Sequence, residues 1–234
     1  MWSRVACLLG GVFLAHPAQA CRLALVLAMD VSSSVDATED ALQRQGLARA
    51  LIDPAVMEAF FATDDPVALN VFEWSGRYNQ AQLADWTLIR SPADLTALSQ
   101  RIATSRRSHN DFPTALGYAL GYAAGLLQTA PACLFQTVDV AGDGINNEGF
   151  GPEEAYTAFP FDDVTVNGLV VNAADVAGEV GLIPYYRDHV IHGPAAFIEI
   201  ASHFDDYAEA MRRKLIRELG APMLGGLPAC LPRG

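Results

Sequence analysis

Lysine is almost absent from this 234-residue chain, in which Lys214 is the only one. Charged residues make up 18% of the sequence, and 27 acids against 15 lysines and arginines give a net charge of −12. A surface of this sign repels nucleic acid and anionic membranes, so we expect neither as a partner. The sequence has no low-complexity tract, and 51% of its residues are hydrophobic, which suffices for one full core.

The chain also lacks an apolar run long enough to cross a bilayer as a helix of the mature protein. An apolar stretch, VACLLGGVFLA, follows Arg4 and precedes the small residues AQA. This order is typical of a secretory signal peptide and predicts a periplasmic or secreted protein. Loss of Arg4 would change the net charge from −12 to −13. The predicted organisation is a signal peptide at 1–20 with cleavage after Ala20, one folded domain at 21–220 and a tail at 221–234.

Cysteine is scarce, and the cysteines do not have the spacing of a zinc site. Cys7 belongs to the predicted signal peptide, so Cys21, Cys133 and Cys230 remain. An odd number in an oxidising compartment predicts one disulfide and one free or intermolecular thiol. The sequence does not determine which two are paired. A lipid anchor on Cys21 is an alternative, although the leucine usual three positions upstream is missing.

Strand-like and helix-like segments alternate along the rest of the chain. Continuous apolar runs such as 22–30 are typical of strands buried on both faces. The alternation predicts an α/β fold with a doubly wound, mostly parallel central sheet, whose functional crevice lies at the carboxyl ends of the strands. The expected strands are 22–30, 67–75, 83–89, 134–142, 163–172 and 195–201, and the expected helices are 35–53, 91–105, 113–128, a short one after Pro152, and 202–219. Capping-box spacing occurs at Asp36 with Glu39 and at Ser202 with Asp205.

Three polar loops lie at that edge of the predicted sheet. They are DVSSS at 30–34, SHNDFPTAL at 108–116 and GDGINN at 142–147. Together they offer two carboxylates, several hydroxyls and amide oxygens, with no cysteine and at most one histidine. Hard oxygen donors of this kind suit Mg²⁺, Mn²⁺ or Ca²⁺ better than zinc.

The sequence DVSSS resembles the Asp-x-Ser-x-Ser motif of the von Willebrand factor type A domain, and VDVAGDG is similar to the third metal-site loop of that fold. The likeness covers essentially the whole chain after residue 20, because the order of strands and helices also fits. VFEWSG, WTLI, DVAGDGINNEG, YYRDHVIHGPAAF and MRRKLIREL more closely resemble one group of secreted bacterial proteins of this fold with no established activity.

This resemblance implies a metal-ion-dependent adhesion site. Ser32 and Ser34 would bind the ion through their hydroxyls, and Asp30 and Asp143 would hold it directly or through water. Asn110 stands where the family has a threonine. The resemblance further implies that a carboxylate from a partner protein completes the coordination, so that the cation bridges the two proteins. Asp111 and Thr114 are possible substitutes for Asn110 as ligands.

An enzymatic interpretation competes with this one. GDGINN is one residue away from the Gly-Asp-Gly-x-Asn-Asp of haloacid dehalogenase-type phosphatases, which also place an aspartate after their first strand. The general acid of those enzymes is replaced here by Ser32, the last aspartate is replaced by Asn147, and no lysine precedes this loop. Phosphoryl transfer would therefore lack most of its electrostatic stabilisation.

Other site types find less support in the sequence. No Gly-x-Ser-x-Gly elbow is present for a serine hydrolase. His189 and His192 could bind a transition metal, but solvated loop histidines are the simpler interpretation. We expect a non-enzymatic protein-binding domain, with a metal-free scaffold as a further alternative. The sequence specifies neither the partner nor the oligomeric state.

Overall fold

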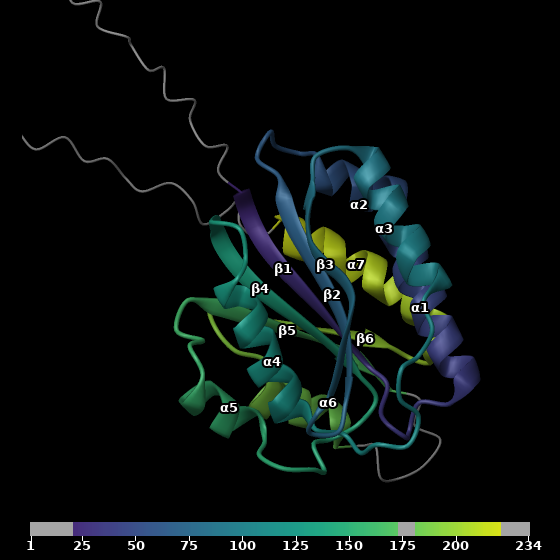
Figure 1. The fold of residues 1–234 in the computed structure, drawn as a ribbon, viewed down its shortest axis with the longest axis vertical. Helices are drawn as coiled ribbons and strands as arrows, with labels where there is room; N and C mark the ends of the chain where they lie inside the picture. Colours follow the sequence, from purple (N-terminus) through teal and green to yellow (C-terminus); the bar gives the residue numbers. More distant parts are fainter. Residues whose placement is uncertain (1–20, 173–180, 221–234) are drawn as a thin grey trace, which may run out of the picture.

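A six-stranded sheet forms the centre of the computed structural model, which describes residues 21–172 and 181–220 (Figure 1). The strand order is β3-β2-β1-β4-β5-β6, and every neighbouring pair is parallel except β2 and β3. The predicted doubly wound, mostly parallel α/β sheet is therefore confirmed. The strands are β1 (Cys21–Asp30), β2 (Val67–Ser75), β3 (Asn79–Ile89), β4 (Cys133–Gly142), β5 (Val164–Val171) and β6 (Ile198–Ala201).

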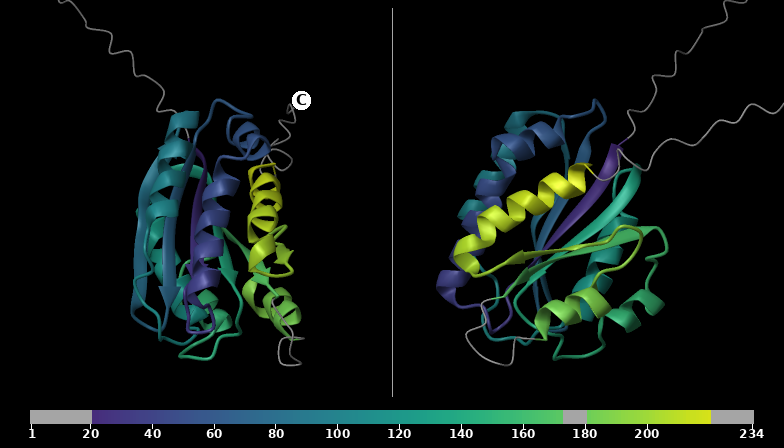
Figure 2. Two further views of the ribbon diagram at one scale, coloured as in Figure 1. Left: turned by 90° about the vertical axis from the view of Figure 1, so that its right-hand side faces the viewer. Right: turned by 180° about the vertical axis from the view of Figure 1, so that it is seen from behind.

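Helices cover both faces of this sheet (Figure 2). One face packs against α1, α2, α3 and α7, and the other against α4, α5 and α6, so that two apolar cores flank the sheet. Within the described residues, no helix is both long and apolar enough to span a membrane. The helices are α1 (Ala37–Leu51), α2 (Pro54–Phe60), α3 (Pro92–Thr104), α4 (Leu116–Gln128), α5 (Pro152–Ala158), α6 (Leu182–Tyr185), a π-helical turn (Tyr186–Val190), a 3₁₀ turn (Phe204–Asp206) and α7 (Tyr207–Gly220).

The strand β1 lies at the middle of the sheet between β2 and β4, and all ten of its residues are buried. Its side chains alternate between the two cores, with Leu23, Leu25 and Leu27 in one and Ala24 and Val26 in the other. Burial of each leucine contributes about 1.5–3 kcal/mol. This strand therefore fixes the position of the loop that follows it.

Helix starts agree with the sequence in one case and differ in another. Asp36 and Glu39 form the expected capping box at the start of α1. The prediction that Ser202 and Asp205 cap the last helix is wrong, because a 3₁₀ turn precedes α7. The backbone N–H of Ser202 instead donates to Asp206, at 3.2 Å.

The strand β3 is longer than expected and begins at Asn79 rather than at residue 83. It pairs antiparallel with β2 as a hairpin. Gly76 has a φ of +49° in the connecting turn, a backbone conformation that favours glycine. The Gln80 side chain donates to the Gly76 carbonyl and closes the turn, at 3.1 Å.

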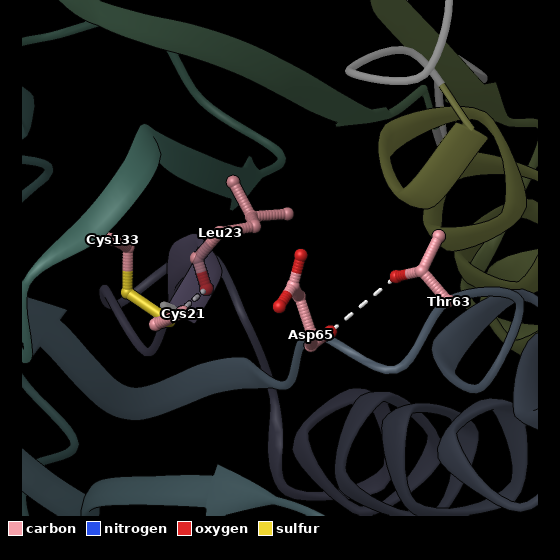
Figure 3. The surroundings of a disulfide bond; sticks show 5 residues. All are labelled: Cys21, Leu23, Thr63, Asp65 and Cys133. Carbon is pink, nitrogen blue, oxygen red and sulfur yellow. Dashed lines mark hydrogen bonds between the residues drawn. A yellow bond between two sulfur atoms is a disulfide. The ribbon is translucent and has the colours of Figure 1, made fainter. Parts of the chain in front are cut away.

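A disulfide joins Cys21 to Cys133 at the amino ends of β1 and β4 (Figure 3). The two cysteines are paired in register on these neighbouring strands. The expectation of one disulfide is confirmed, and the structure identifies its partners. Cys230 and the predicted signal peptide lie outside the described residues.

Arg22 is a buried cation that ties three elements together next to this disulfide. Its guanidinium donates to the carbonyls of Leu219 at 2.9 Å, Ala59 at 2.7 Å and Phe60 at 3.0 Å. These carbonyls belong to the last turns of α7 and α2. The beginning of β1 and the end of α7 therefore lie side by side. They lie at the end of the sheet where β1 begins, opposite its carboxyl end.

Candidate metal centre

Asp30 ends β1 and is 1% exposed. Its Oδ1 accepts a hydrogen bond from the Ser32 backbone N–H at 2.7 Å, and the Gln43 side chain donates to its carbonyl oxygen at 2.7 Å. Its Oδ2 is buried and has no hydrogen-bond partner among the described residues. An unpaired buried carboxylate oxygen is costly, so this atom marks a place where a cation or a donor fits.

Hydroxyl groups connect Asp30's loop to the two other polar loops. The Thr114 hydroxyl lies 3.3 Å from that of Ser32, which in turn lies 3.1 Å from that of Ser34. The Ser34 hydroxyl donates to Oδ1 of Asp143 at 2.7 Å. One chain of contacts thus joins the ends of β1 and β4 to the segment before α4, as the sequence predicts for these three loops.

The carboxylates of Asp30 and Asp143 repel each other. Burial and then the nearby charge of Asp143 raise the pKa of Asp30, hydrogen bonds from Ser32 and the charge of Arg107 lower it, and the net pKa is about 8. A divalent cation between the carboxylates would compensate both charges and favour the ionised form. The electrostatics of the loop edge therefore fit a bound cation.

Gly142 and Tyr186 close the buried side of this cluster. A Cβ atom on Gly142 would lie 2.5 Å from the Tyr186 hydroxyl and 3.0 Å from Oδ2 of Asp30, so only glycine fits there. The Tyr186 hydroxyl is buried and also has no hydrogen-bond partner in the described part of the chain. Burial, and then the charges of Asp30 and Asp143, hold its pKa well above the usual range, so the group is a neutral hydroxyl. Tyr186 lies in the segment YYRDHVIHGPAAF, and its position beside Asp30 was not predicted.

Asn110 and Asp111 lie exposed on the second loop. The hydrogen bond to Ser32 comes instead from Thr114, which is 3% exposed and lies two residues before α4. Thr114 was one of the predicted substitutes for Asn110, and the structure places it in the cluster. Asn110 as a ligand stays a prediction.

The third loop anchors the second one through two asparagines. The side-chain oxygen of Asn147 accepts from the Thr114 backbone N–H at 2.9 Å, and that of Asn146 accepts from the Leu116 N–H at 2.7 Å. The residue before α4 is Ala115, which has no capping side chain of its own. GDGINN therefore provides the cap that α4 lacks, a role that the comparison with phosphatases did not reveal.

Arg107 clamps the backbone of the first loop. Its guanidinium donates to the carbonyls of Val31 at 2.7 Å, Ser32 at 2.8 Å and Val35 at 2.6 Å, and to the His109 carbonyl at 2.6 Å. The planar fork of an arginine can make all these bonds at once. Arg107 is not among the predicted site residues, because its contacts link positions more than seventy residues apart.

A buried ion pair holds the segment that carries Arg107. Glu73 of β2 accepts hydrogen bonds from the backbone N–H of Ser108 at 2.7 Å and from its hydroxyl. The other Glu73 oxygen pairs with Arg44 of α1, which also binds Asp40 at 2.9 Å. Strand β2 and helix α1 thus position the second loop.

We expect Arg107→Met to lower the free energy of unfolding by about 2 kcal/mol, because three backbone carbonyls of the first loop lose a charged donor. Arg107→Lys should recover only part of this, since an ammonium group cannot reproduce the fork. Urea unfolding measures both effects. The matched control is Arg106→Met, which alters the exposed neighbouring arginine. Equal stabilities of Arg107→Met and Arg106→Met would contradict the clamp.

The donor set consists of two carboxylates and three hydroxyls, which suits a hard divalent cation. Residues 21–172 and 181–220 contain no group of three His, Cys, Asp or Glu side chains that could hold a metal. The two histidines considered for a transition metal have other contacts: His189 pairs with Glu153 at 2.8 Å, and His192 stacks on Tyr156. The loop edge thus remains the candidate centre.

A family model described as a protein of unknown function, DUF1194, matches residues 20–223. The chain belongs to the DUF1194 family. No curated protein matches this DUF1194 chain.

Solved structures show that the DUF1194 chain has the fold of a von Willebrand factor type A domain. A von Willebrand factor type A protein from Catenulispora acidiphila has a TM-score of 0.59 at 14% identity, over 86% of this chain and 43% of that one. Proximal thread matrix protein 1 from the mussel byssus has a TM-score of 0.59 at 16% identity, over 86% and 48%. The chain spans less than half the length of these proteins.

Another structure of the mussel protein has a zinc-occupied MIDAS motif, the metal-ion-dependent adhesion site, and matches with a TM-score of 0.58 at 16% identity, over 86% and 48%. The pilus adhesin SpaC from Lactobacillus rhamnosus GG matches with a TM-score of 0.59 at 12% identity, over 86% and 31%. Sequence identities this low show only that the DUF1194 chain shares the fold of these proteins. The zinc is a property of the mussel protein.

Proposed function

We propose that this DUF1194 domain binds a protein partner through a divalent cation at the loop edge. The observation that carries the proposal is the buried, unpaired Oδ2 of Asp30, next to Ser32, Ser34, Thr114 and Asp143. These five side chains would hold the ion. The ion would supply a positive charge to which a carboxylate of the partner binds.

The nature of the donors supports the choice of ion and the location. Carboxylate and hydroxyl oxygens favour Mg²⁺, Mn²⁺ or Ca²⁺. The disulfide between Cys21 and Cys133 is typical of oxidising compartments, which supports a periplasmic or secreted protein. The excess of acids over bases on the chain fits a protein that gathers cations rather than polyanions.

We propose no catalytic role. The single lysine, Lys214 of α7, forms buried ion pairs with Asp139 of β4 and with Glu218 of the same helix. It therefore takes no part in phosphoryl transfer at the loop edge. We expect no turnover of p-nitrophenyl phosphate with or without Mg²⁺. Turnover that Asp30→Asn abolishes would support the phosphatase alternative instead.

Thermal unfolding with and without cation tests the metal centre. At about one hundred times its Kd, a bound cation adds roughly 2.7 kcal/mol, which raises Tm by about 5–10 °C for a domain of this size. Asp30→Ala combined with Ser32→Ala should abolish the rise. Glu58→Gln, at an exposed acid on α2, is the charge-matched control and should keep it.

The same assay distinguishes the two residues proposed for the second loop. Thr114→Val should weaken the cation response more than Asn110→Ala, since only Thr114 contacts Ser32. A response that survives the Asp30 and Ser32 changes would remove the basis of the proposal.

A further inference from the structure

A cavity of about 330 Å³ lies on the α7 side of the sheet, over the amino-terminal parts of β4 and β5. Its floor is formed by Phe135 and Thr137 of β4 and by Thr165 and Asn167 of β5. Among the described elements, α7 crosses this face beside the cavity, and no other helix covers that part of β4 and β5 (Figure 2, right). The cavity shares no residue with the metal centre.

The charge of the cavity lining is entirely negative. The ten lining residues include Asp162, Asp163 and Glu218, and they include no lysine, arginine or histidine. Asp162 and Asp163 are exposed in the turn before β5, whereas Glu218 comes from α7 and is 4% exposed. Charges of one sign in a cavity with low-dielectric walls concentrate the electrostatic potential there, so this cavity attracts cations.

Glu218 has one satisfied and one unsatisfied oxygen. Its Oε1 accepts from Lys214 Nζ at 2.6 Å and from Asn167 Nδ2 at 2.8 Å. Its Oε2 is buried without a hydrogen-bond partner in the described ranges. A buried carboxylate oxygen without a donor is costly, so an N–H donor entering the cavity would gain a strong, charge-assisted bond.

The buried cluster of Glu218, Asp139 and Lys214 contains two carboxyl groups and one ammonium group. Lys214 is the only cation of the buried cluster, and it pairs at 2.7 Å with Asp139 as well as with Glu218. Burial raises the pKa of Asp139 to about 7, which agrees with a cluster that has one carboxylate too many. A second cation would complete the pairing.

A constrained loop forms the aromatic wall of the cavity. Ala195 has a φ of +58°, which is unfavourable for a residue with a Cβ. The loop is held because the Phe197 backbone N–H donates to Oδ1 of Asn167, at 3.0 Å. The Arg217 guanidinium lies 3.8 Å from the centroid of the Phe197 ring without lining the cavity, and Lys214 Nζ lies 5.1 Å from the same centroid, so this ring already contacts two cations.

We propose that this cavity binds an organic cation, a primary ammonium or guanidinium group attached to a short apolar body. The ammonium or guanidinium would donate to Oε2 of Glu218, and the body would pack against Phe135 and Phe197. Asp162 and Asp163 would attract the cation to the entrance. A volume of about 330 Å³ lies at the small end of the range for ligand pockets and limits the ligand to a small molecule or a single side chain.

Calorimetric titration of the full chain with phenethylamine, in the presence of EDTA, tests this inference apart from the metal centre. We expect saturable binding at one site. The neutral isostere 2-phenylethanol should bind at least about tenfold more weakly, because it lacks the charge that Glu218 and the entrance acids attract. Equal affinities, or no saturation with the amine, would overturn the proposal.

Two sets of variants locate the bound amine. Glu218→Gln should raise the Kd of phenethylamine by about tenfold or more, since a buried charge pair is lost. Asp162→Asn with Asp163→Asn leaves the buried cluster intact and should raise it by about two- to fivefold. Glu58→Gln is the control and should leave the Kd unchanged. Binding that neither set weakens would place the amine elsewhere and overturn the assignment.

Discussion

Lys214→Met is expected to lower the free energy of unfolding by about 3–5 kcal/mol. Lys214 is fully buried, and its ammonium is the only positive charge between Asp139 and Glu218. Without it, two carboxylates remain in the interior with no counter-charge. Removing one partner of a buried pair is more harmful than replacing the whole group, because the charge left behind is not solvated. Urea unfolding followed by circular dichroism measures the loss.

A compensating variant separates charge from packing in this experiment. In the Lys214→Met background, Asp139→Asn with Glu218→Gln should recover a large part of the lost stability, since no charge stays unpaired. Arg212→Met, at a partly exposed arginine paired with Glu209, should have a much smaller effect. A loss below about 1 kcal/mol for Lys214→Met would contradict the assigned role of the cluster.

Removal of the disulfide is the second change with a large expected effect. Cys21→Ser with Cys133→Ser should destabilise the domain by roughly 2–5 kcal/mol, because the bond closes a long loop in the unfolded chain. The two cysteines are 112 positions apart. The measurement is the urea midpoint of the oxidised protein and of the double variant.

Reduction provides the matched comparison for the disulfide. Dithiothreitol should lower the stability of the unchanged protein to that of the double variant, and it should leave the double variant unchanged. Cys230→Ser should retain the oxidised stability, because the structural bond does not involve this residue. A Cys230→Ser protein as unstable as the double variant would show that the pairing is different.

The sequence was sufficient to predict the sheet and the loops at its edge. Strand β1 is a continuous apolar run, which is recognisable because both of its faces are buried. Asp30 and Asp143 each follow such a run, and parallel strands bring their carboxyl ends to one edge. Their proximity therefore follows from topology alone.

The supporting contacts could not be predicted in the same way. Arg107 stabilises the first loop through carbonyl groups, which carry no residue-specific pattern in the sequence. The choice of Thr114 over Asn110 as the contact of Ser32 depends on where α4 begins, and element boundaries depend on tertiary contacts. Here those contacts are the hydrogen bonds that the Asn147 and Asn146 side-chain oxygens accept from the backbone N–H groups of Thr114 and Leu116.

One local signal was present but was interpreted incompletely. Pro54 directly follows the helix expected at 35–53, and on the sequence alone it marks the end of that helix. In the structure, Asp53 caps α2 through Ala55, and Pro54 occupies the first turn of that helix. Proline is favourable at this position because the first N–H groups of a helix have no internal partner.

The hydrogen bond from Arg22 to the end of α7 brings the two ends of the described domain together, and this decides which side of the domain faces an attachment. The beginning of β1 and the end of α7 lie together at one pole of the domain, and the carboxyl end of β1 lies at the other (Figure 1). A tether, a fusion protein or a surface linkage joined directly to either end of the described domain would therefore begin at the pole opposite Asp30. The pole where we propose that the cation binds is thus the one farther from the attachment, and it stays accessible to the proposed partner.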